Sequence, residues 1–358
     1  MTNNFSSYPQ SHTWKEILSE GAVWQQVLEE LSGSTVIDSI LAQGHKRREW
    51  IFVGCGTSYY LAESAAYSWT LLTGQPTRAL PGSEVLLFPK IVQAEGADLQ
   101  AVVISRSGKT SEAVRAATAL SKDLKVPTIG ITCAENSELQ KACDITIVLA
   151  GADEQSMVMT RSFTSMLMAL QYLAARQVKN AAFIADLWKM AEEFAPRIMS
   201  ISQQMQEFVR TRSFADYVFL GQGACYGLAR EAALKVMEMS CSYSQFFHTL
   251  EFRHGPKAIV TPETCLTFFL SDATQETEAE VLGEMKEMGG VTMAICNRAT
   301  DKLRWASDLL VEYNFAGNEL ALLAGFVVPC QLFGFFTGTQ KGLNPDCPKN
   351  LTRVVMLD

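Results

Sequence analysis

The chain repeats itself, and this duplication constrains its fold more than any other feature. Residues 51–66 (IFVGCGTSYYLAESAA) align without a gap on residues 218–233 (VFLGQGACYGLAREAA). Further matches follow in the same order in both halves: Ser105 with Ser271, Glu112 with Glu278, residues 128–131 with 292–295, and Asp144 with Asp308. Because Ser105 and Glu112 belong to one segment, four segments recur in the same order, and this indicates a duplicated domain: one chance match is easy and four in order are not.

Each copy alternates short runs of β-branched or aromatic residues with helical stretches. The first copy gives strands IFVG, AVVIS, TIGIT and ITIVLA, with helices over residues 61–72 and 111–122. This alternation is typical of an α/β fold with a parallel sheet covered by helices on both faces, which binds ligands at the carboxyl ends of its strands. We expect a helical lead over 1–34, domains over 35–195 and 196–340, and a tail over 341–358.

Length and composition bound the functional class. The 358 residues suffice for two domains, and a formal net charge of -8 argues against a nucleic-acid partner. Nine scattered cysteines without a CxxC pair and only four histidines argue against a metal site, and we expect no cofactor. The N-terminus lacks the basic and apolar regions of a secretory signal, so we expect a cytoplasmic protein with reduced thiols.

One apolar stretch, residues 320–338, raises the question of a membrane span. Pro329, Gln331 and three glycines interrupt it, and nothing else in the sequence resembles a membrane segment. We therefore favour a helix that is buried or lies at a subunit interface, and expect no membrane partner.

The turn after the strand AVVI has the composition of a phosphate site. It reads Ser105-Arg106-Ser107-Gly108-Lys109-Thr110, and hydroxyls with backbone N–H groups at a helix start can bind a phosphate dianion. Simple helix capping by Ser and Thr explains this turn equally well. A nucleotide P-loop does not, because Val103 stands where that motif needs glycine. The equivalent turn of the second copy, residues 271–276, is acidic, so only the first copy suits a phosphate.

The second copy contains acid–base residues instead. Glu231, Lys235 and Glu238 have the spacing of one helix face, although a solvated ion pair is the commoner meaning of such a pattern. His254 precedes Gly-Pro and must lie in an irregular loop. Glutamate and histidine are the residue types that move a proton between sugar carbons and open a sugar ring, and a structural histidine remains an equal alternative.

The same motifs, taken together, resemble the sugar isomerase (SIS) family over nearly the whole chain. They are GCGTS (54–58), SRSGKT (105–110), MVMTRSFT (157–164), AREAALKVME (229–238), EFRHGPKAIV (251–260) and NPDCPKNLTRVV (344–355). Within the family the chain is similar to the isomerase half of glucosamine-6-phosphate synthase, and more closely to stand-alone galactosamine- or glucosamine-6-phosphate deaminase/isomerases. The resemblance implies two tandem flavodoxin-like SIS domains.

The resemblance also implies roles for individual residues. Glu238 would transfer the proton between C1 and C2, Lys235 would line the site, and His254 would open the ring, reaching across from the partner subunit of a homodimer. The tail would close the site. The implied phosphate and sugar ligands are Cys55, Gly56, Thr57, Ser58, Ser105, Arg106, Ser107, Gly108, Thr110, Met159, Thr160 and Arg353.

Two departures from the synthase pattern shape the functional hypothesis. Only a short polar lead precedes the first copy, so we expect no glutaminase domain and no glutamine-derived ammonia. Arg353 stands where the synthase has a Schiff-base lysine, and arginine cannot form that imine, although Lys349 lies one turn away.

We therefore expect an aldose-ketose isomerase that deaminates a hexosamine 6-phosphate, releasing ammonia and a ketose 6-phosphate. The alternatives are a deglycase for fructosyl-amine 6-phosphates, a synthase-like isomerase without the glutaminase domain, and a non-catalytic sugar-phosphate sensor.

Overall fold

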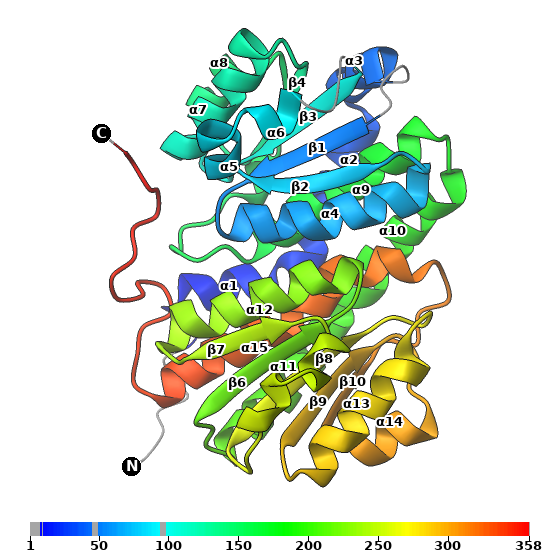
Figure 1. The fold of residues 1–358 in the computed structure, drawn as a ribbon, viewed down its shortest axis with the longest axis vertical. Coiled ribbons are helices and arrows are strands. Elements are labelled where there is room, and N and C mark those ends of the chain that lie inside the picture. Colours follow the sequence, from blue (N-terminus) through cyan, green and yellow to red (C-terminus); the bar gives the residue numbers. More distant parts are fainter. Residues whose placement is uncertain (1–7, 9, 45–48, 94–97, 358) are drawn as a thin grey trace. The chain divides into compact units, whose positions relative to one another are not determined.

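The chain folds into two compact units, each built around one sheet (Figure 1). The structure is a computed structural model that describes residues 8, 10–44, 49–93 and 98–357. The first-sheet unit contains residues 19–154 and 161–192 together with the described residues from Thr352 onward. The second-sheet unit contains the described residues up to Leu18, residues 155–160 and residues 193–351. The two units therefore interleave along the sequence.

The first sheet has five parallel strands in the order β2-β1-β3-β4-β5. The strands are β1 (Glu49–Gly54), β2 (Thr77–Pro81), β3 (Leu99–Ile104), β4 (Thr128–Thr132) and β5 (Ile145–Val148). Four of them match the predicted runs. The edge strand β2 has the sequence TRALP and was not predicted, because it lacks a run of β-branched or aromatic residues.

Helices cover both faces of this sheet. On one face Trp69 of α4 (Thr57–Thr73) packs against Trp50 and Phe52 of β1, with ring centroids 4.4 and 5.4 Å apart. On the other face the alanines of α7 (Ser111–Thr118) join the apolar core of β1 and β3. The remaining helices of the unit are α2 (Glu20–Ser32), α3 (Thr35–Gly44), α5 (Gly82–Leu87), α6 (Lys90–Gln93), α8 (Glu138–Ala142) and α9 (Arg161–Gln177), and α10 (Ala181–Phe194) begins in it.

The second sheet repeats this topology in the order β7-β6-β8-β9-β10, again all parallel. Its strands are β6 (Asp216–Gly221), β7 (Ser244–Phe247), β8 (Thr264–Leu270), β9 (Val291–Cys296) and β10 (Leu309–Glu312). Its helices are α1 (His12–Leu18), α11 (Ile198–Arg210), α12 (Ala224–Ser240), α13 (Gln275–Glu287), α14 (Asp301–Ala306) and α15 (Leu323–Gln340). The predicted α/β fold with tandem parallel sheets is confirmed.

The duplication extends to backbone detail. Gly56 and Gly223 precede equivalent helices with φ values of 55° and 58°, in a region that favours glycine. Asp144 accepts a hydrogen bond from the backbone N–H of Thr128, and Asp308 accepts one from that of Thr292, at 2.8 and 2.9 Å. The segments aligned in the sequence therefore occupy equivalent places in the two sheets.

The apolar stretch of the sequence forms α15, preceded by a 3-10 turn. The segment Glu319–Gln340 is long and apolar enough to cross a membrane, yet 94% of its most apolar window is buried within the fold. Gly334 and Gly338 allow α15 to pack closely on α12, since an added Cβ would lie 2.9 Å from the Lys235 carbonyl oxygen and 2.2 Å from that of Met239. The prediction of a buried helix is confirmed.

Candidate functional site

The first sheet brings two of the predicted loops to one edge. Strands β1 and β3 are parallel neighbours, with Val53 opposite Val103, so the loops at residues 55–58 and 105–110 follow the same ends of adjacent strands. The strand order reverses between β1 and β3, which makes this the switch point where such sheets bind ligands. We call residues 55–58 and 105–110 the phosphate cradle.

Within the phosphate cradle, Ser105 gives the clearest indication of a ligand-binding site. It is 3% exposed, and its Oγ finds no hydrogen-bond partner among the described residues. A buried hydroxyl left in this state costs about 1–3 kcal/mol, so such groups normally have a partner. Thr57 and Ser58, in the first turn of α4, are also buried at this edge.

The remaining residues of the phosphate cradle form a tight turn at the start of α7. Gly108 has φ of 59°, and a Cβ there would lie 2.4 Å from the Ser137 side chain. Ser107 Oγ accepts a hydrogen bond from the Lys109 N–H at 3.2 Å, and Thr110 is the residue before α7. Burial, together with the charge of Glu112, raises the pKa of Cys55 to about 11, so its thiol remains neutral beside an anion.

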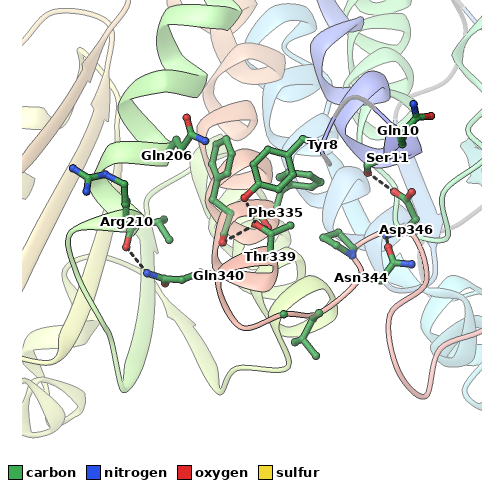
Figure 2. Close-up of a pocket in the computed structure, with 15 residues that line it drawn as sticks. Tyr8, Gln10, Ser11, Gln206, Arg210, Phe335, Thr339, Gln340, Asn344 and Asp346 are labelled. Carbon is green, nitrogen blue, oxygen red and sulfur yellow. Dashed lines mark hydrogen bonds between the residues drawn. The ribbon is translucent and has the colours of Figure 1, made fainter. Parts of the chain in front are cut away.

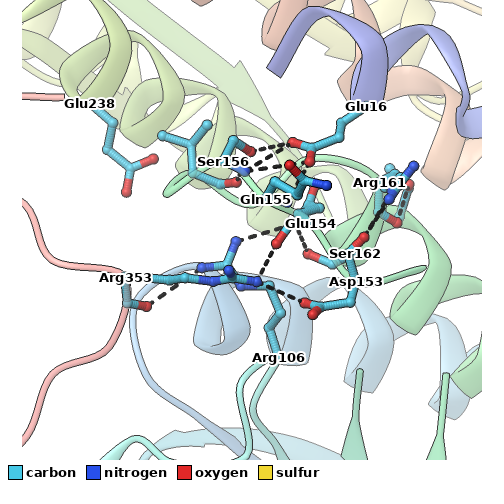
Figure 3. A network of polar contacts seen from close by, with 12 residues as sticks. Glu16, Arg106, Asp153, Glu154, Gln155, Ser156, Arg161, Ser162, Glu238 and Arg353 are labelled. Atoms are coloured by element: carbon cyan, nitrogen blue, oxygen red, sulfur yellow. Dashed lines mark hydrogen bonds and ion pairs between the residues drawn. The ribbon is translucent and has the colours of Figure 1, made fainter. Parts of the chain in front are cut away.

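Arg106 lies in the phosphate cradle, but its side chain is engaged elsewhere. Its Nη1 lies 3.3 Å from Oε2 of Glu154, and both side chains are buried. The Ser162 hydroxyl donates to the same carboxylate oxygen (Figure 3). Glu154 was missed by the sequence reasoning, because it is 48 residues from Arg106 and no local pattern marks the pair. A phosphate-binding role for the Arg106 side chain stays a prediction.

Arg353 also binds the segment before α9. Its Nη2 lies 3.1 Å from Asp153 Oδ1, and it donates to the Glu154 carbonyl oxygen. Lys349, the other basic residue of the tail considered above, is exposed and belongs to the second-sheet unit.

The equivalent switch-point turn of the second sheet is already occupied by a carboxylate of the protein. Ser271, the counterpart of Ser105, donates its hydroxyl to Glu319 Oε1 at 2.8 Å, and the Asp272 N–H donates to the other oxygen. Glu319 comes from the turn before α15, 48 residues away, so the acidic turn was foreseen and this contact was not. The two switch-point turns therefore differ, because the serine of the second turn already bonds a carboxylate of the protein.

The predicted acid–base residues lie on one face of α12. Lys235 Nζ lies 3.2 Å from Glu231 Oε1 and donates to Glu238 Oε2. The side chains of Lys235 and Glu231 are fully buried, and that of Glu238 is 17% exposed, so a solvated surface pair is excluded. Burial alone lowers the pKa of Lys235, but the two carboxylates outweigh it and leave this pKa raised. Lys235 is therefore a buried ammonium beside a carboxylate that reaches solvent.

His254 lies at the opposite end of α12 from Glu238. It is exposed and follows the 3-10 turn Glu251–Arg253. The nearby His248 stacks on Tyr226 in the first turn of α12, with ring centroids 3.7 Å apart, and accepts a backbone hydrogen bond from Phe252. Tyr226 and Glu238 are about 18 Å apart along the helix axis, at 1.5 Å per residue. Glu238 and His254 of one chain therefore do not meet.

Met159 and Thr160 lie in the segment 155–160, which belongs to the second-sheet unit. Thr160 is buried and Met159 half-buried. The segment is held by Glu16 of α1, whose buried carboxylate accepts the Gln155 and Ser156 N–H groups at 2.5 and 3.4 Å (Figure 3). Sequence reasoning missed Glu16 because only the fold joins residues so far apart.

A separate cavity of about 430 Å³ lies in the second-sheet unit (Figure 2). It is lined by Tyr8, by residues of α11 and α15, and by the segment 342–346, and it contains none of the predicted site residues. Tyr8 partly fills it, with its hydroxyl 3.2 Å from Thr339 Oγ1 and its ring against Phe335 and Phe336. Within the described ranges of the chain, no group of three or more His, Cys, Asp or Glu side chains could hold a metal ion.

Sequence comparisons match this chain to known proteins along most of its length. A profile of the SIS domain matches residues 45–176 and 216–335. Glutamine–fructose-6-phosphate aminotransferase of Pyrobaculum aerophilum is 26% identical over 340 residues, covering 92% of this chain and 54% of that protein. The protein of the same name from Pseudomonas putida is 27% identical, covering 96% and 58%. The chain thus spans about half the length of the curated relatives it matches.

Solved structures share the fold over the whole chain. Glucosamine-6-phosphate deaminase from Thermotoga maritima is 28% identical, with a TM-score of 0.77 and coverage of 97% of this chain and 100% of that one. Tagatose-6-phosphate ketose/aldose isomerase from Escherichia coli has a TM-score of 0.82 with coverage of 96% of each chain, but at 22% identity it supports the fold alone.

Proposed function

The chain belongs to the SIS-domain family, and we propose that it is an enzyme that interconverts the aldose and ketose forms of a sugar 6-phosphate, with hexosamine 6-phosphates as substrates. In this proposal the reaction is a deamination that releases ammonia and a ketose 6-phosphate. The carrying observation is the buried Ser105 hydroxyl at the switch point of the first sheet, which finds no partner within the described part of the chain.

The phosphate cradle supplies what a phosphate dianion needs. The hydroxyls of Thr57, Ser58 and Ser105 lie at one edge of the sheet, and α7 begins directly after the turn that contains Ser105, so the positive end of its helix dipole lies at this edge. In the second copy Glu319 supplies the anion itself, so we propose one sugar phosphate per chain, bound by the first copy.

The second copy supplies the proton-transfer group in this proposal. Glu238 removes the proton from C2 of the open-chain aldose amine and returns it to C1, which leaves a ketose with an imine at C2. Water then hydrolyses the imine and releases ammonia. The two carboxylates keep the pKa of Lys235 raised, so Lys235 remains protonated between Glu231 and Glu238 and holds the Glu238 carboxylate in place.

His254 enters the proposal through a second copy of the chain. Because it lies at the other end of α12 from Glu238, it cannot open the ring of a sugar held against Glu238 of its own chain. We propose that His254 acts in the site of a partner subunit, in a homodimer.

The amino-sugar part of the proposal rests on relatives and on one residue. The Thermotoga maritima protein, named as a glucosamine-6-phosphate deaminase, covers nearly all of both chains. Arg353 cannot form an imine with the substrate, so we propose a route in which water, rather than a lysine, attacks C2 of the substrate imine and nitrogen leaves as ammonia.

The test is ammonia release from glucosamine 6-phosphate and galactosamine 6-phosphate by the purified protein. Wild type should release ammonia, and Glu238→Gln should lose at least about a hundredfold in kcat while still binding the sugar phosphate. Glu207→Gln, which removes an exposed carboxylate paired with Arg210, is the matched control.

If Glu238→Gln keeps wild-type turnover, the proposed mechanism is wrong. Release of an amine other than ammonia from fructosyl-amine 6-phosphates alone would favour a deglycase, and binding without any turnover would favour a sensor.

A further inference from the structure

Three arginines of the first-sheet unit converge on the turn Asp153-Glu154 (Figure 3). Arg106 pairs with the Glu154 carboxylate, and Arg353 pairs with the Asp153 carboxylate. Arg161 donates from Nε to the Asp153 carbonyl oxygen at 3.2 Å. Two guanidinium groups therefore pair with the two carboxylates of this turn, and a third binds its backbone.

Arg106 connects this turn to two other parts of the unit. Its backbone carbonyl accepts hydrogen bonds from the Thr132 hydroxyl and the Cys133 N–H, both at 3.0 Å, which fixes the phosphate cradle to the end of β4. Its Nη2 donates to the Arg353 carbonyl oxygen at 3.5 Å. One buried side chain thus contacts both Glu154 and the C-terminal segment.

The C-terminal segment in turn crosses the start of the cradle helix. We call residues 353–357 the strap. Ser111, the first residue of α7, donates its N–H to the Val355 carbonyl oxygen at 3.2 Å and accepts the Leu357 N–H on its Oγ at 3.0 Å. Arg115 donates to the Leu357 carbonyl oxygen at 3.3 Å. The strap therefore occupies one of the N–H groups at the same helix end that the phosphate cradle uses.

We propose that Glu154 is a positioning residue which, through Arg106, holds the phosphate cradle and the strap together, so that sugar-phosphate binding and docking of the strap are coupled. The proposal rests on the proposed function, because it concerns the same site. The negative charge of the Glu154 carboxylate fixes the Arg106 guanidinium between the turn and the Arg353 carbonyl. Without that charge the buried guanidinium loses its counter-ion and turns toward solvent, and both the cradle turn and the strap lose an anchor.

In this arrangement Arg353 holds the strap in place and takes no part in the reaction. Its guanidinium bonds Asp153 and the Glu154 carbonyl, and its own carbonyl accepts from Arg106. A lysine at this position could not make the planar, multiply bonded contact.

The test is amide hydrogen exchange of the intact protein, with glucosamine 6-phosphate as the probe, combined with steady-state kinetics. In Glu154→Gln the strap amides should exchange at least about tenfold faster without ligand, the ligand should protect them less, and KM should rise about tenfold with kcat nearly retained. Arg353→Ala, which removes a partly exposed side chain, should speed strap exchange by a smaller factor. Arg304→Ala, which breaks an exposed ion pair with Glu312 in the second-sheet unit, should leave the strap unchanged.

Removing one partner of a buried ion pair can prevent folding, so a second variant covers that outcome. Arg106→Met combined with Glu154→Leu replaces the pair by apolar side chains of similar size, a change that proteins often tolerate. This variant should fold and show the same fast strap exchange and raised KM.

Wild-type strap exchange in a folded variant of either kind overturns the positioning role. Ligand binding that leaves the wild-type strap unprotected overturns the coupling. If wild type instead shows no thermal shift with any hexosamine 6-phosphate, the proposed function itself fails, and ligand-free strap exchange in the variants still tests separately whether Glu154 and Arg106 hold the strap.

Discussion

The two sheets share one topology, yet their switch-point turns differ in whether the serine hydroxyl already has a partner in the protein. In the first copy Ser105 is buried with an Oγ that no described residue bonds, and in the second copy Ser271 bonds Glu319. The helices that follow the first strand of each sheet, α4 and α12, differ in the reverse sense. Glu231, Lys235 and Glu238 of α12 correspond in the alignment to Ser64, Ser68 and Leu71 of α4, none of which is an acid or a base. In the function that we propose, one copy therefore holds an anion and the other moves a proton.

The largest expected effect separates the two helices. Glu238→Gln should lower kcat for ammonia release by at least about a hundredfold, since it removes the proton-transfer group. Leu71→Gln, at the equivalent exposed position of α4, should leave kcat within about twofold. Stopped or continuous ammonia assays measure kcat of both variants. If both substitutions lower kcat equally, the proton-transfer role does not belong to α12 alone.

The two serines provide the next contrast. Ser105→Ala should weaken sugar-phosphate binding about tenfold, since a hydroxyl bond to a charged ligand contributes about 1.5–3 kcal/mol. The same change should not lower the melting temperature of the free protein, because the hydroxyl bonds no described residue. Ser271→Ala should do the opposite, lowering stability and leaving affinity unchanged. Calorimetric titration measures the affinity for the sugar phosphate, and thermal unfolding measures the stability. A loss of affinity in Ser271→Ala, or a loss of stability in Ser105→Ala, would contradict this contrast.

Removing the Glu319 carboxylate tests whether this side chain alone prevents the turn at Ser271 from binding a phosphate. Glu319→Ala leaves the Ser271 hydroxyl and the Asp272 N–H without their partner and should cost about 2 kcal/mol of unfolding free energy. Because Asp272 and Glu278 remain, we expect no new phosphate site, and titration should still give one sugar phosphate per chain. A second equivalent bound by this variant would mean that Glu319 alone distinguishes the two turns.

The smallest effect is a pH dependence of stability in the second copy. Burial raises the pKa of Glu278 above that of the free side chain, and hydrogen bonds from Thr249 and Thr274 offset this only partly. The folded state therefore binds a proton more tightly than the unfolded state. The contribution of Glu278 to the free energy of unfolding is fully present below its unfolded pKa and is lost as pH rises through its raised folded pKa. Glu278→Gln should flatten that part of the stability curve, measured by chemical unfolding at several pH values. If the stability of the variant depends on pH in the same way as that of the wild type, the raised pKa of Glu278 is not the cause.

Sequence patterns were enough for most of the fold because they depend on local periodicity and on repeats. Strands β1, β3 and β4 are runs of mainly buried residues and β5 is a short β-branched run, and the glycines at 54, 56, 221 and 223 mark both strand-to-helix turns. The edge strand β2 was missed, because a half-exposed strand lacks a continuous apolar run. The spacing of Glu231, Lys235 and Glu238 gave their shared helix face, but not their burial.

The phosphate cradle and the acid–base helix were thus determined by sequence alone as candidate regions, since each is a contiguous motif with its own composition. The tertiary structure alone decided which groups inside them are engaged. Glu154 on Arg106, Glu319 on Ser271 and the strap on Ser111 all join residues that are distant in the chain. Such pairs depend on where whole elements pack, and only folding brings their charges and hydrogen-bonding groups within reach of one another.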